Sequence, residues 1–483
     1  MLLQSVILVA ATFSKQVFAS HGKIYKYVAA FSIDGLHSSD VEKYVALRPE
    51  STIASLLSTG YEYTDAYTSG PSDSFPGTMN LFTGSSPRTT RVWYDDTYDR
   101  SFWPPFSTTG SNCSGPPGAE VVYDESKDYD STMLFSGGIN PLNLPQTLVS
   151  EKCVNLYPHS RLRVNTAFEV VHAAGHQTAY TDKHPAYDIV RGPSGAGLSV
   201  GYFPEIAAVD ADVDSTIAYD KLHVKAFLDW INAKTPVNST IYEPLKTIPT
   251  LFGGNFQAVS VGQKVYGYVK GTLAFTPQLL KAYDFVDASL GQVVAALKAK
   301  SILEDTLIIV ASKHGQAPID PTLYGKVDPA LLNLIIKVPV ESITTDDIAL
   351  IFLQNHADTD AAVDNLNRNR NTLKIADIIS GDRLTYLGYG DPKTDPAVPD
   401  IIVRPDTGII YTTSKSKIAE HGGLSDDDRK VACFVSNPGL KKTVYDHRVS
   451  TAQVAPTILE ALGLDAQALQ GVVAEKTRLL DGF

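Results

Sequence analysis

The stretch Tyr27-Val-Ala-Ala-Phe-Ser-Ile33, followed by Asp34-Gly35, contains the pattern that decides the fold. Seven mostly apolar residues that end at a turn-forming pair are typical of a buried β-strand. Apolar residues at helical spacing follow in residues 41–47 and 53–57. The stretch therefore predicts a strand that is buried on both faces and is followed by helix.

The same alternation of strand and helix recurs along the chain. Residues 279–298 show helical spacing, and the buried-strand pattern 306–311 ends at Lys313-His314-Gly315. Further strand patterns lie at 400–404 and 431–435, and a helical pattern lies at 452–462. This order predicts an α/β fold, a doubly wound and mostly parallel sheet with helices on both faces. Sites in such sheets lie at the carboxyl ends of strands, where Asp34 and His314 fall.

Composition limits the classes of protein to which the chain can belong. Of its 483 residues, 43% are hydrophobic and 19% charged, which is typical of a packed globular protein and not of a disordered one. A net charge of -12 repels nucleic-acid polymers and anionic membranes, so neither is expected as a partner. We expect one domain over residues 20–483, with a loop-rich surface insertion at about 99–144, where Pro, Gly and Ser are frequent.

The N-terminus indicates export. Its apolar run ends near Phe13 and is too short to span a bilayer, and small residues suited to signal peptidase follow at 17–19. Residues 1–19 are therefore predicted to be a signal peptide of a secreted protein; the alternative is a buried first strand or helix. No later segment approaches the roughly 20 apolar residues of a membrane span.

Three cysteines fit an oxidising compartment if two of them pair. Cys433 lies within the apolar run 431–435 and is expected to be a buried free thiol, which leaves Cys113 to pair with Cys153. Asn112 and Asn238 begin N-glycosylation sequons.

Ser74 is the candidate nucleophile. It lies in the loop Pro71-Ser-Asp-Ser74-Phe-Pro76, just before a predicted helix. Free N–H groups and the positive end of the helix dipole stabilise an attacked phosphate and a serine alkoxide. The alternative is that Ser74 only caps the helix, and Asp34 has a similar alternative as a turn former.

Four short motifs together resemble the type I phosphodiesterase/nucleotide pyrophosphatase family of the alkaline phosphatase superfamily. They occur in the family's order and span most of the mature chain: Ile33-Asp34-Gly35, Pro71-Ser-Asp-Ser74-Phe-Pro76, Ser312-Lys-His314-Gly315 and Glu420-His421-Gly422. The resemblance implies an alkaline-phosphatase-like fold and a site with two zinc ions, which would activate the nucleophile. It implies that Asp34 and His314 are ligands at one metal site and His421 at the other, with Ser74 as the nucleophile and a further metal ligand.

The sequence departs from the family pattern at both metal sites. Lys313 stands where the family has the Asp of an Asp-His pair, and an ammonium cannot ligate a metal. The family's Asp-x-x-x-His is missing: an ungapped register places Tyr266 and Lys270 there, and a gapped one places Asn255 or Gln257 nearby. Zinc or another divalent metal is therefore expected in fewer than two ions, or not at all if the site is degenerate.

Two interpretations follow for the lysines. In the first, Lys313 and Lys270 bind phosphate and supply the charge that a metal would supply. In the second, the site binds a ligand without turning it over. Lys183 and His184 either add positive charge that extends to the site or form a surface turn set by Pro185.

The sequence thus predicts a secreted hydrolase of small phosphate esters, most of all phosphodiesters, that acts through Ser74. Sulfate ester hydrolysis and a degenerate secreted binding protein of the same fold are the alternatives.

Overall fold

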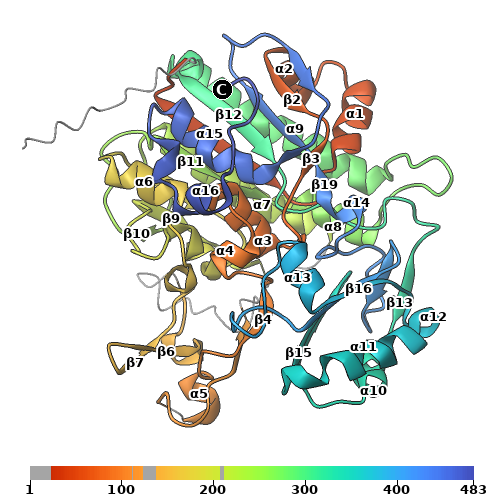
Figure 1. Cartoon of the computed structure of the whole chain (residues 1–483). Helices are drawn as coiled ribbons and strands as arrows, with labels where there is room; N and C mark the ends of the chain where they lie inside the picture. Colours follow the sequence, from red (N-terminus) through yellow and green to blue (C-terminus); the bar gives the residue numbers. More distant parts are fainter. Residues whose placement is uncertain (1–22, 111, 123–137, 207–211) are drawn as a thin grey trace, which may run out of the picture.

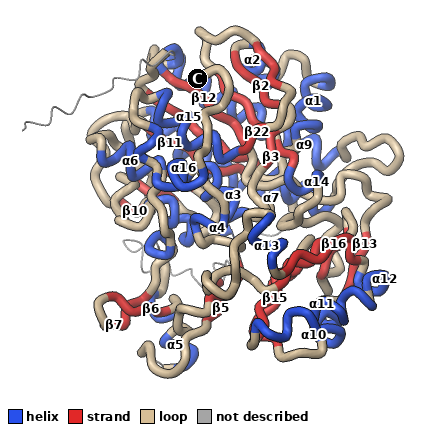
Figure 2. The backbone as a smooth tube through the Cα atoms, viewed as in Figure 1, coloured by secondary structure: helices blue, strands red, loops and turns tan. Residues whose placement is uncertain are grey.

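The computed structural model describes residues 23–110, 112–122, 138–206 and 212–483. Its centre is a sheet of nine strands in the order β10-β9-β8-β11-β1-β12-β20-β2-β21 (Figures 1 and 2). The strands are β10 (Thr240–Ile241), β9 (Val200–Tyr202), β8 (Thr178–Thr181), β11 (Leu251–Phe256), β1 (Tyr27–Ile33), β12 (Thr306–Ala311), β20 (Cys433–Ser436), β2 (Gly60–Tyr63) and β21 (Thr443–Tyr445). Neighbours pair in parallel from β9 to β12, whereas β10 and β20 run antiparallel to their neighbours. The sheet is mostly parallel, as predicted.

Helices cover both faces of this sheet because the side chains of each strand alternate between the faces. Val28 and Ala30 of β1 belong to one hydrophobic core, and Ala29, Phe31 and Ile33 belong to the other. The first core includes residues of α3 (Ser74–Thr83), α6 (Ala167–Ala173), α15 (Val454–Ala461) and α16 (Gln470–Glu475). The second includes residues of α1 (Ser38–Leu47), α2 (Thr52–Ser58), α7 (Val213–Ile231), α8 (Ala258–Val265) and α9 (Pro277–Ala299). The doubly wound α/β architecture is confirmed.

A second, smaller sheet was not predicted. Its antiparallel order is β14 (Val340–Thr345), β15 (Ala349–Leu353), β17 (Ile401–Pro405), β16 (Ile375–Ser380). One face packs against α10 (Ala330–Ile336), α11 (Thr359–Arg368) and α12 (Arg370–Leu373), and α13 (Asp382–Tyr386) follows β16. The strand pattern at 400–404 belongs here and not to the main sheet, because an apolar run shows burial but not the sheet in which it is buried. This sheet and its helices form a lobe beside the main body (Figure 1).

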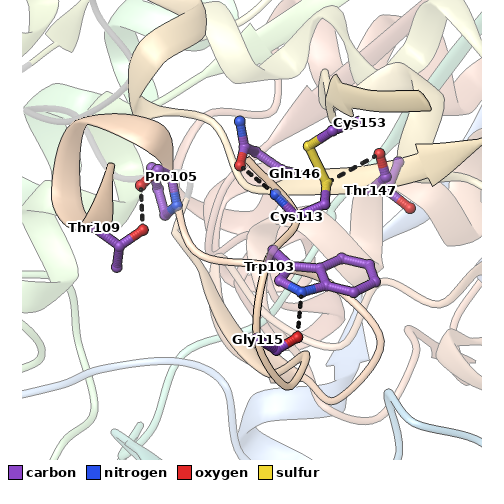
Figure 3. Close-up of a disulfide and its surroundings, with 8 residues drawn as sticks. All are labelled: Trp103, Pro105, Thr109, Cys113, Gly115, Gln146, Thr147 and Cys153. Carbon is purple, nitrogen blue, oxygen red and sulfur yellow. Dashed lines mark hydrogen bonds between the residues drawn. A yellow bond between two sulfur atoms is a disulfide. The ribbon is translucent and has the colours of Figure 1, made fainter. Parts of the chain in front are cut away.

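The predicted insertion begins in the hairpin of β4 (Asp96–Asp99) and β5 (Ala119–Val122) and includes α5 (Phe106–Thr109). A second hairpin of β6 (Gln146–Val149) and β7 (Lys152–Asn155) follows it. Cys113 and Cys153 form a disulfide that ties the two hairpins together (Figure 3), and Cys433 is free and buried. The disulfide expected from the cysteine pattern is therefore present.

The remaining elements are short. They are β3 (Ala66–Tyr67), β19 (Lys430–Val431), β22 (Val449–Ser450), β13 (Gly325–Val327), β18 (Ile409–Tyr411), α4 (Pro87–Thr90), α14 (Asp426–Arg429) and the 3-10 helices η2 (Pro141–Asn143), η3 (His159–Arg161), η4 (Pro185–Arg191), η6 (Leu303–Asp305), η7 (His356–Asp358), η8 (Thr451–Gln453) and η9 (Ala466–Ala468). Within the described residues no helix is long and apolar enough to cross a membrane. The predicted signal peptide, residues 1–19, lies outside the described residues.

Candidate active site

Asp34 lies directly after β1, at the carboxyl end of the central strand, and is fully buried. The chain turns away from it at Gly35, whose φ of +79° favours glycine. A Cβ at residue 35 would also lie 2.0 Å from the Oε1 of Gln263. The Nδ2 of Asn255, at the end of the neighbouring β11, donates a hydrogen bond of 3.1 Å to the Oδ2 of Asp34. Two adjacent strand ends therefore hold this carboxylate.

Ser74 is the first residue of α3 and is 2% exposed. The cap of this helix is Asp73, whose Oδ2 accepts a hydrogen bond of 3.1 Å from the backbone N–H of Phe75. The sequence placed Ser74 just before the helix and allowed that it was the cap. Because Asp73 has that role, the hydroxyl of Ser74 is available for other contacts.

The start of α3 lies directly on the end of β12. A Cβ at Gly77 would lie only 2.0 Å from the backbone oxygen of Lys313, so the helix approaches the strand end at backbone distance. The Oγ1 of Thr68 donates a hydrogen bond of 2.5 Å to the same oxygen. This packing brings Ser74 next to the Lys313-His314 segment, although about 240 residues separate them.

Lys313 is fully buried between two carboxylates. Its Nζ lies 3.5 Å from the Oδ1 of Asp34 and 3.1 and 3.2 Å from the two carboxylate oxygens of Asp182, which follows β8. It also donates a hydrogen bond of 3.3 Å to the hydroxyl of Tyr187 and lies 4.4 Å from the centre of that ring. The ammonium therefore joins the ends of β1, β8 and β12.

Lys183 is the lysine that contacts the candidate nucleophile. Its Nζ donates a hydrogen bond of 3.1 Å to the Oγ of Ser74 and lies 3.5 Å from the Oδ2 of Asp34. Its side chain is 10% exposed, whereas that of Lys313 is inaccessible. Thus one ammonium bridges the hydroxyl and the carboxylate and still borders solvent.

Two histidines complete the cluster. The Nε2 of His314 lies 3.6 Å from the Oδ2 of Asp34, and the ring centres of His314 and His421 are 3.9 Å apart. The Nδ1 of His421 lies 3.3 Å from the Oδ1 of Asp73. The structure therefore brings together Asp34, Ser74, Lys313, His314 and His421, all of which the sequence singled out.

The charges of this cluster shift two pKa values in ways that follow from burial. Burial alone would raise the pKa of Asp34, but Lys313, His314 and Lys183 hold this pKa well below its usual range. Burial, with the nearby His314 and Lys264, lowers the pKa of His421 well below its usual value. The site thus combines an ionised Asp34 with a neutral His421 at neutral pH.

Other candidate residues lie elsewhere. Lys270 is exposed in a turn after α8, and its charge acts on Asp320 and not on the Asp34 and Ser74 cluster. Asn112 and Asn238 are both exposed, which a glycosylation acceptor requires. Their glycosylation stays a prediction.

The donor set does not fit the pair of zinc ions that the family resemblance implies. Ammonium groups lie 3.5 Å from each carboxylate oxygen of Asp34, and an ammonium repels a cation and offers no lone pair. Asn255 and Gln257 occupy the end of β11, where the sequence lacked the second carboxylate and histidine. Among the described residues, no group of three or more His, Cys, Asp or Glu side chains is placed to hold a metal.

The doubly wound sheet carries an Asp at a strand end, a serine at a helix N-terminus and two adjacent histidines. This combination defines an alkaline-phosphatase-like hydrolase fold. Residues 28–429 match the model of the type I phosphodiesterase/nucleotide pyrophosphatase family. The chain belongs to this family and is a phosphodiesterase/pyrophosphatase-type hydrolase. Comparison with curated protein sequences found no match.

Solved structures of low sequence identity share the fold. Murine ectonucleotide pyrophosphatase/phosphodiesterase 5 is 15% identical, with a TM-score of 0.58, and the match covers 91% of this chain and 96% of that one. An inactive variant of the murine protein in complex with AMP is 15% identical, with a TM-score of 0.58 and coverage of 92% and 96%. The human protein is 14% identical, with a TM-score of 0.57 and coverage of 91% and 95%.

Sequence reasoning did not find Asp182, and it left the role of Lys183 open. Both follow β8, a strand of four residues that is too short to give a clear periodic pattern. The available signal was the charged pair Asp182-Lys183 directly after Thr178-Ala-Tyr-Thr181. Had that segment been assigned as a strand, both residues would have been expected at the carboxyl edge of the sheet.

Proposed function

We propose that the protein hydrolyses small phosphate esters, phosphodiesters above all, through a phosphorylated Ser74, with the ammonium of Lys183 supplying at the nucleophile the positive charge that a metal ion would supply. The observation that supports this most directly is the 3.1 Å hydrogen bond from the Nζ of Lys183 to the Oγ of Ser74. An ammonium beside a serine hydroxyl stabilises negative charge on the oxygen that attacks and on the phosphoryl oxygens.

The proposed reaction has two displacement steps. Attack forms a bond between the Oγ of Ser74 and phosphorus and breaks the bond from phosphorus to the leaving oxygen. The hydroxyl proton ends on the departing alcohol. A water molecule then attacks phosphorus, breaks its bond to the Oγ of Ser74, restores the hydroxyl and releases a phosphate monoester that keeps the second ester group. Double displacement divides one difficult step into two easier ones.

The roles of the other residues follow from their contacts. Lys313 and Asn255 hold the carboxylate of Asp34, and Asp34 in turn lies beside the ammonium of Lys183. Asp73 fixes the start of α3 and lies 3.3 Å from the Nδ1 of His421. Preorganised groups of this kind need no rearrangement when charge develops, which is the main source of electrostatic catalysis.

A nucleotide-derived phosphodiester is the substrate class to test first. Family membership supports it, and the murine neighbour has been solved with AMP. Sulfate esters have a tetrahedral centre of similar shape and are the second class to test. For the compartment, we propose secretion, which the Cys113–Cys153 disulfide supports because such bonds persist in oxidising environments.

A covalent intermediate would test the proposal directly. Purified protein is mixed with a nitrophenyl phosphodiester, quenched in acid and analysed by peptide mass spectrometry, with Ser74→Ala as the control. We expect Ser74 of the wild type only to carry the phosphoryl group together with the ester substituent that is not displaced. Metal content is measured on the same preparation, and turnover is assayed after chelation and after addition of zinc, manganese or calcium.

The degenerate binding protein gives a different set of results. It would show no phosphoserine and no turnover under any metal condition, while still binding nucleotide. Turnover that disappears with chelation and returns in proportion to one bound ion would instead favour a single-metal site and contradict the role proposed for Lys183.

A further inference from the structure

A cavity is lined by Asn80, which lies in the second half of α3, the helix that starts with Ser74. It has a volume of about 570 Å³, and Asn80, Ser86 and Arg88 line one wall, whereas the C-terminal segment 475–479 lines another. Asp34, Ser74 and Lys183 do not line it. Cavities of this size accommodate small-molecule ligands.

The lining of this cavity is cationic although the protein is acidic. Five lining residues are lysine or arginine and two are acidic, whereas the whole chain has a net charge of -12. The cations come from four separate segments: Arg88 on α4, Arg429 on α14, Arg448 before β22, and Lys476 and Arg478 after α16. Positive charges gathered in one place repel one another, and this repulsion lowers the stability of the fold unless an anion binds.

The two acidic residues offset only part of this positive charge. The Oε1 of Glu475 accepts hydrogen bonds from the backbone N–H of Ser86 (2.9 Å), the Oγ of Ser86 (2.6 Å) and the Oγ1 of Thr89 (2.5 Å). Asp481 pairs with His447 at 2.7 Å. Both carboxylates are therefore engaged on the wall of the cavity.

Four of the five cations form no ion pair in the part of the chain that the structure describes, where only Arg448 has an ionic partner. Arg88, Lys476 and Arg478 are exposed and form no ion pair there. Arg429 donates hydrogen bonds of 3.3 and 3.0 Å to the backbone oxygen of Thr68, and Arg448 lies 3.4 Å from Asp65. The guanidinium groups of Arg88 and Arg478 thus keep their donors for a ligand.

We infer that this cavity is a binding site for an oligophosphate, a small ligand with at least two phosphate groups. Guanidinium groups match phosphate oxygens in pairs of parallel hydrogen bonds, and a lysine adds a compact positive charge. Linked phosphates carry more negative charge and are longer than a single phosphate, so they match five cations from four segments in a cavity of this volume better. This site is separate from Ser74 and does not depend on the reaction proposed for it.

Titration calorimetry with tripolyphosphate tests the assignment. The protein is the full chain with Ser74→Ala, so that a probe cleaved at Ser74 cannot confuse the result. We expect one site per chain, weaker binding of orthophosphate, and affinity that falls as salt increases. Arg88→Gln and Arg478→Gln should each weaken binding by about tenfold or more, the scale of a lost charge-assisted hydrogen bond.

A matched control distinguishes the effect of charges that line the cavity from the effect of the protein's net charge. Lys221→Gln with Lys300→Gln removes two exposed positive charges that do not line the cavity, and it should change affinity less than about twofold. Thermal unfolding checks that each variant is folded. Sucrose octasulfate in place of tripolyphosphate distinguishes a sulfated ligand from a phosphorylated one.

Four outcomes would overturn the assignment. The first is no binding at millimolar tripolyphosphate. The second is an equal loss of affinity in the Lys221 and Lys300 control. In the third, Lys183→Met abolishes binding while Arg88→Gln leaves it unchanged, which would place the phosphate at Ser74. Tighter binding of the polysulfate would also contradict a phosphate ligand.

Discussion

The Nζ of Lys183 lies 3.1 Å from the Oγ of Ser74, so an ammonium group contacts the candidate nucleophile directly. The contact joins the end of β8 to the start of α3. It places the cation where negative charge would develop during attack on phosphorus.

Replacement of Ser74 by alanine should abolish turnover and leave the fold intact. The helix cap is Asp73, so the loss of the Ser74 hydroxyl should cost less than the roughly 1 kcal/mol of a cap. Hydrolysis rates and thermal unfolding of the two proteins are compared. A variant with near-normal rates would show that Ser74 is not the nucleophile.

Lys183→Met should reduce kcat by about a hundredfold or more, the scale observed when one preorganised electrostatic donor is removed. Stability should change little, because Asp34 keeps its contacts with Lys313 and Asn255. Steady-state kinetics measure the effect, with Lys221→Met on the exposed face of α7 as the matched control. If both variants kept wild-type kcat, the lysine-for-metal mechanism would be wrong.

Lys313→Met should act first on stability. Its ammonium lies between two buried carboxylates, and removal of one partner of a buried ion pair costs about 3–5 kcal/mol. Lys313 holds the pKa of Asp34 down, and a carboxylate with a lowered pKa contributes stability above its unfolded pKa of about 4 that is lost as the pH falls.

The difference in unfolding free energy between wild type and Lys313→Met should therefore be largest near neutral pH and should narrow in acid. Urea denaturation at several pH values measures it. A difference that does not change with pH would mean that Lys313 acts through packing alone.

Asp220 should contribute stability that is lost as the pH rises, the opposite of the pH dependence expected for Asp34. Burial raises its pKa to about 8, although the backbone N–H groups of Gln257 and Ala258 donate to its Oδ2. A raised carboxyl pKa gives stability that is complete below the unfolded pKa of about 4 and is lost as the pH rises through 8. Asp220→Asn keeps a neutral side chain, so its stability relative to wild type should increase between pH 4 and 9. Thermal unfolding of both proteins across this pH range measures the difference. A stability difference that does not change with pH would contradict the raised pKa of Asp220.

The sequence predicted the main sheet because its central strands are continuous apolar runs that are followed by polar, titratable residues. Tyr27–Ile33 and Thr306–Ala311 are such runs, and parallel pairing places the residues that follow them at one edge. This is why Asp34 and His314 could be expected to meet. The smaller sheet escaped prediction because β14 to β17 pair with one another, which depends on contacts between segments distant in sequence.

The exact roles of the lysines could not be deduced from the sequence. Lys313 was expected at a phosphoryl group, but its ammonium is engaged by Asp34 and Asp182, and Asp182 is a partner that only the tertiary structure reveals. Lys270 was selected by an ungapped register, and it lies in an exposed turn. Charge and spacing identify which residues can bind phosphate, whereas the fold decides which of them face the nucleophile.

Gly77 shows that a residue without any functional group can determine the spacing of those that have one. Because its missing side chain lets α3 lie against the backbone oxygen of Lys313, the helix that starts with Ser74 and the strand end that leads to His314 meet as rigid parts. A methyl group at residue 77 would push the start of α3, and Ser74 with it, away from Lys313 and His314, although no polar side chain would be replaced. A random search for inactive variants should therefore recover changes at this glycine alongside changes at Ser74.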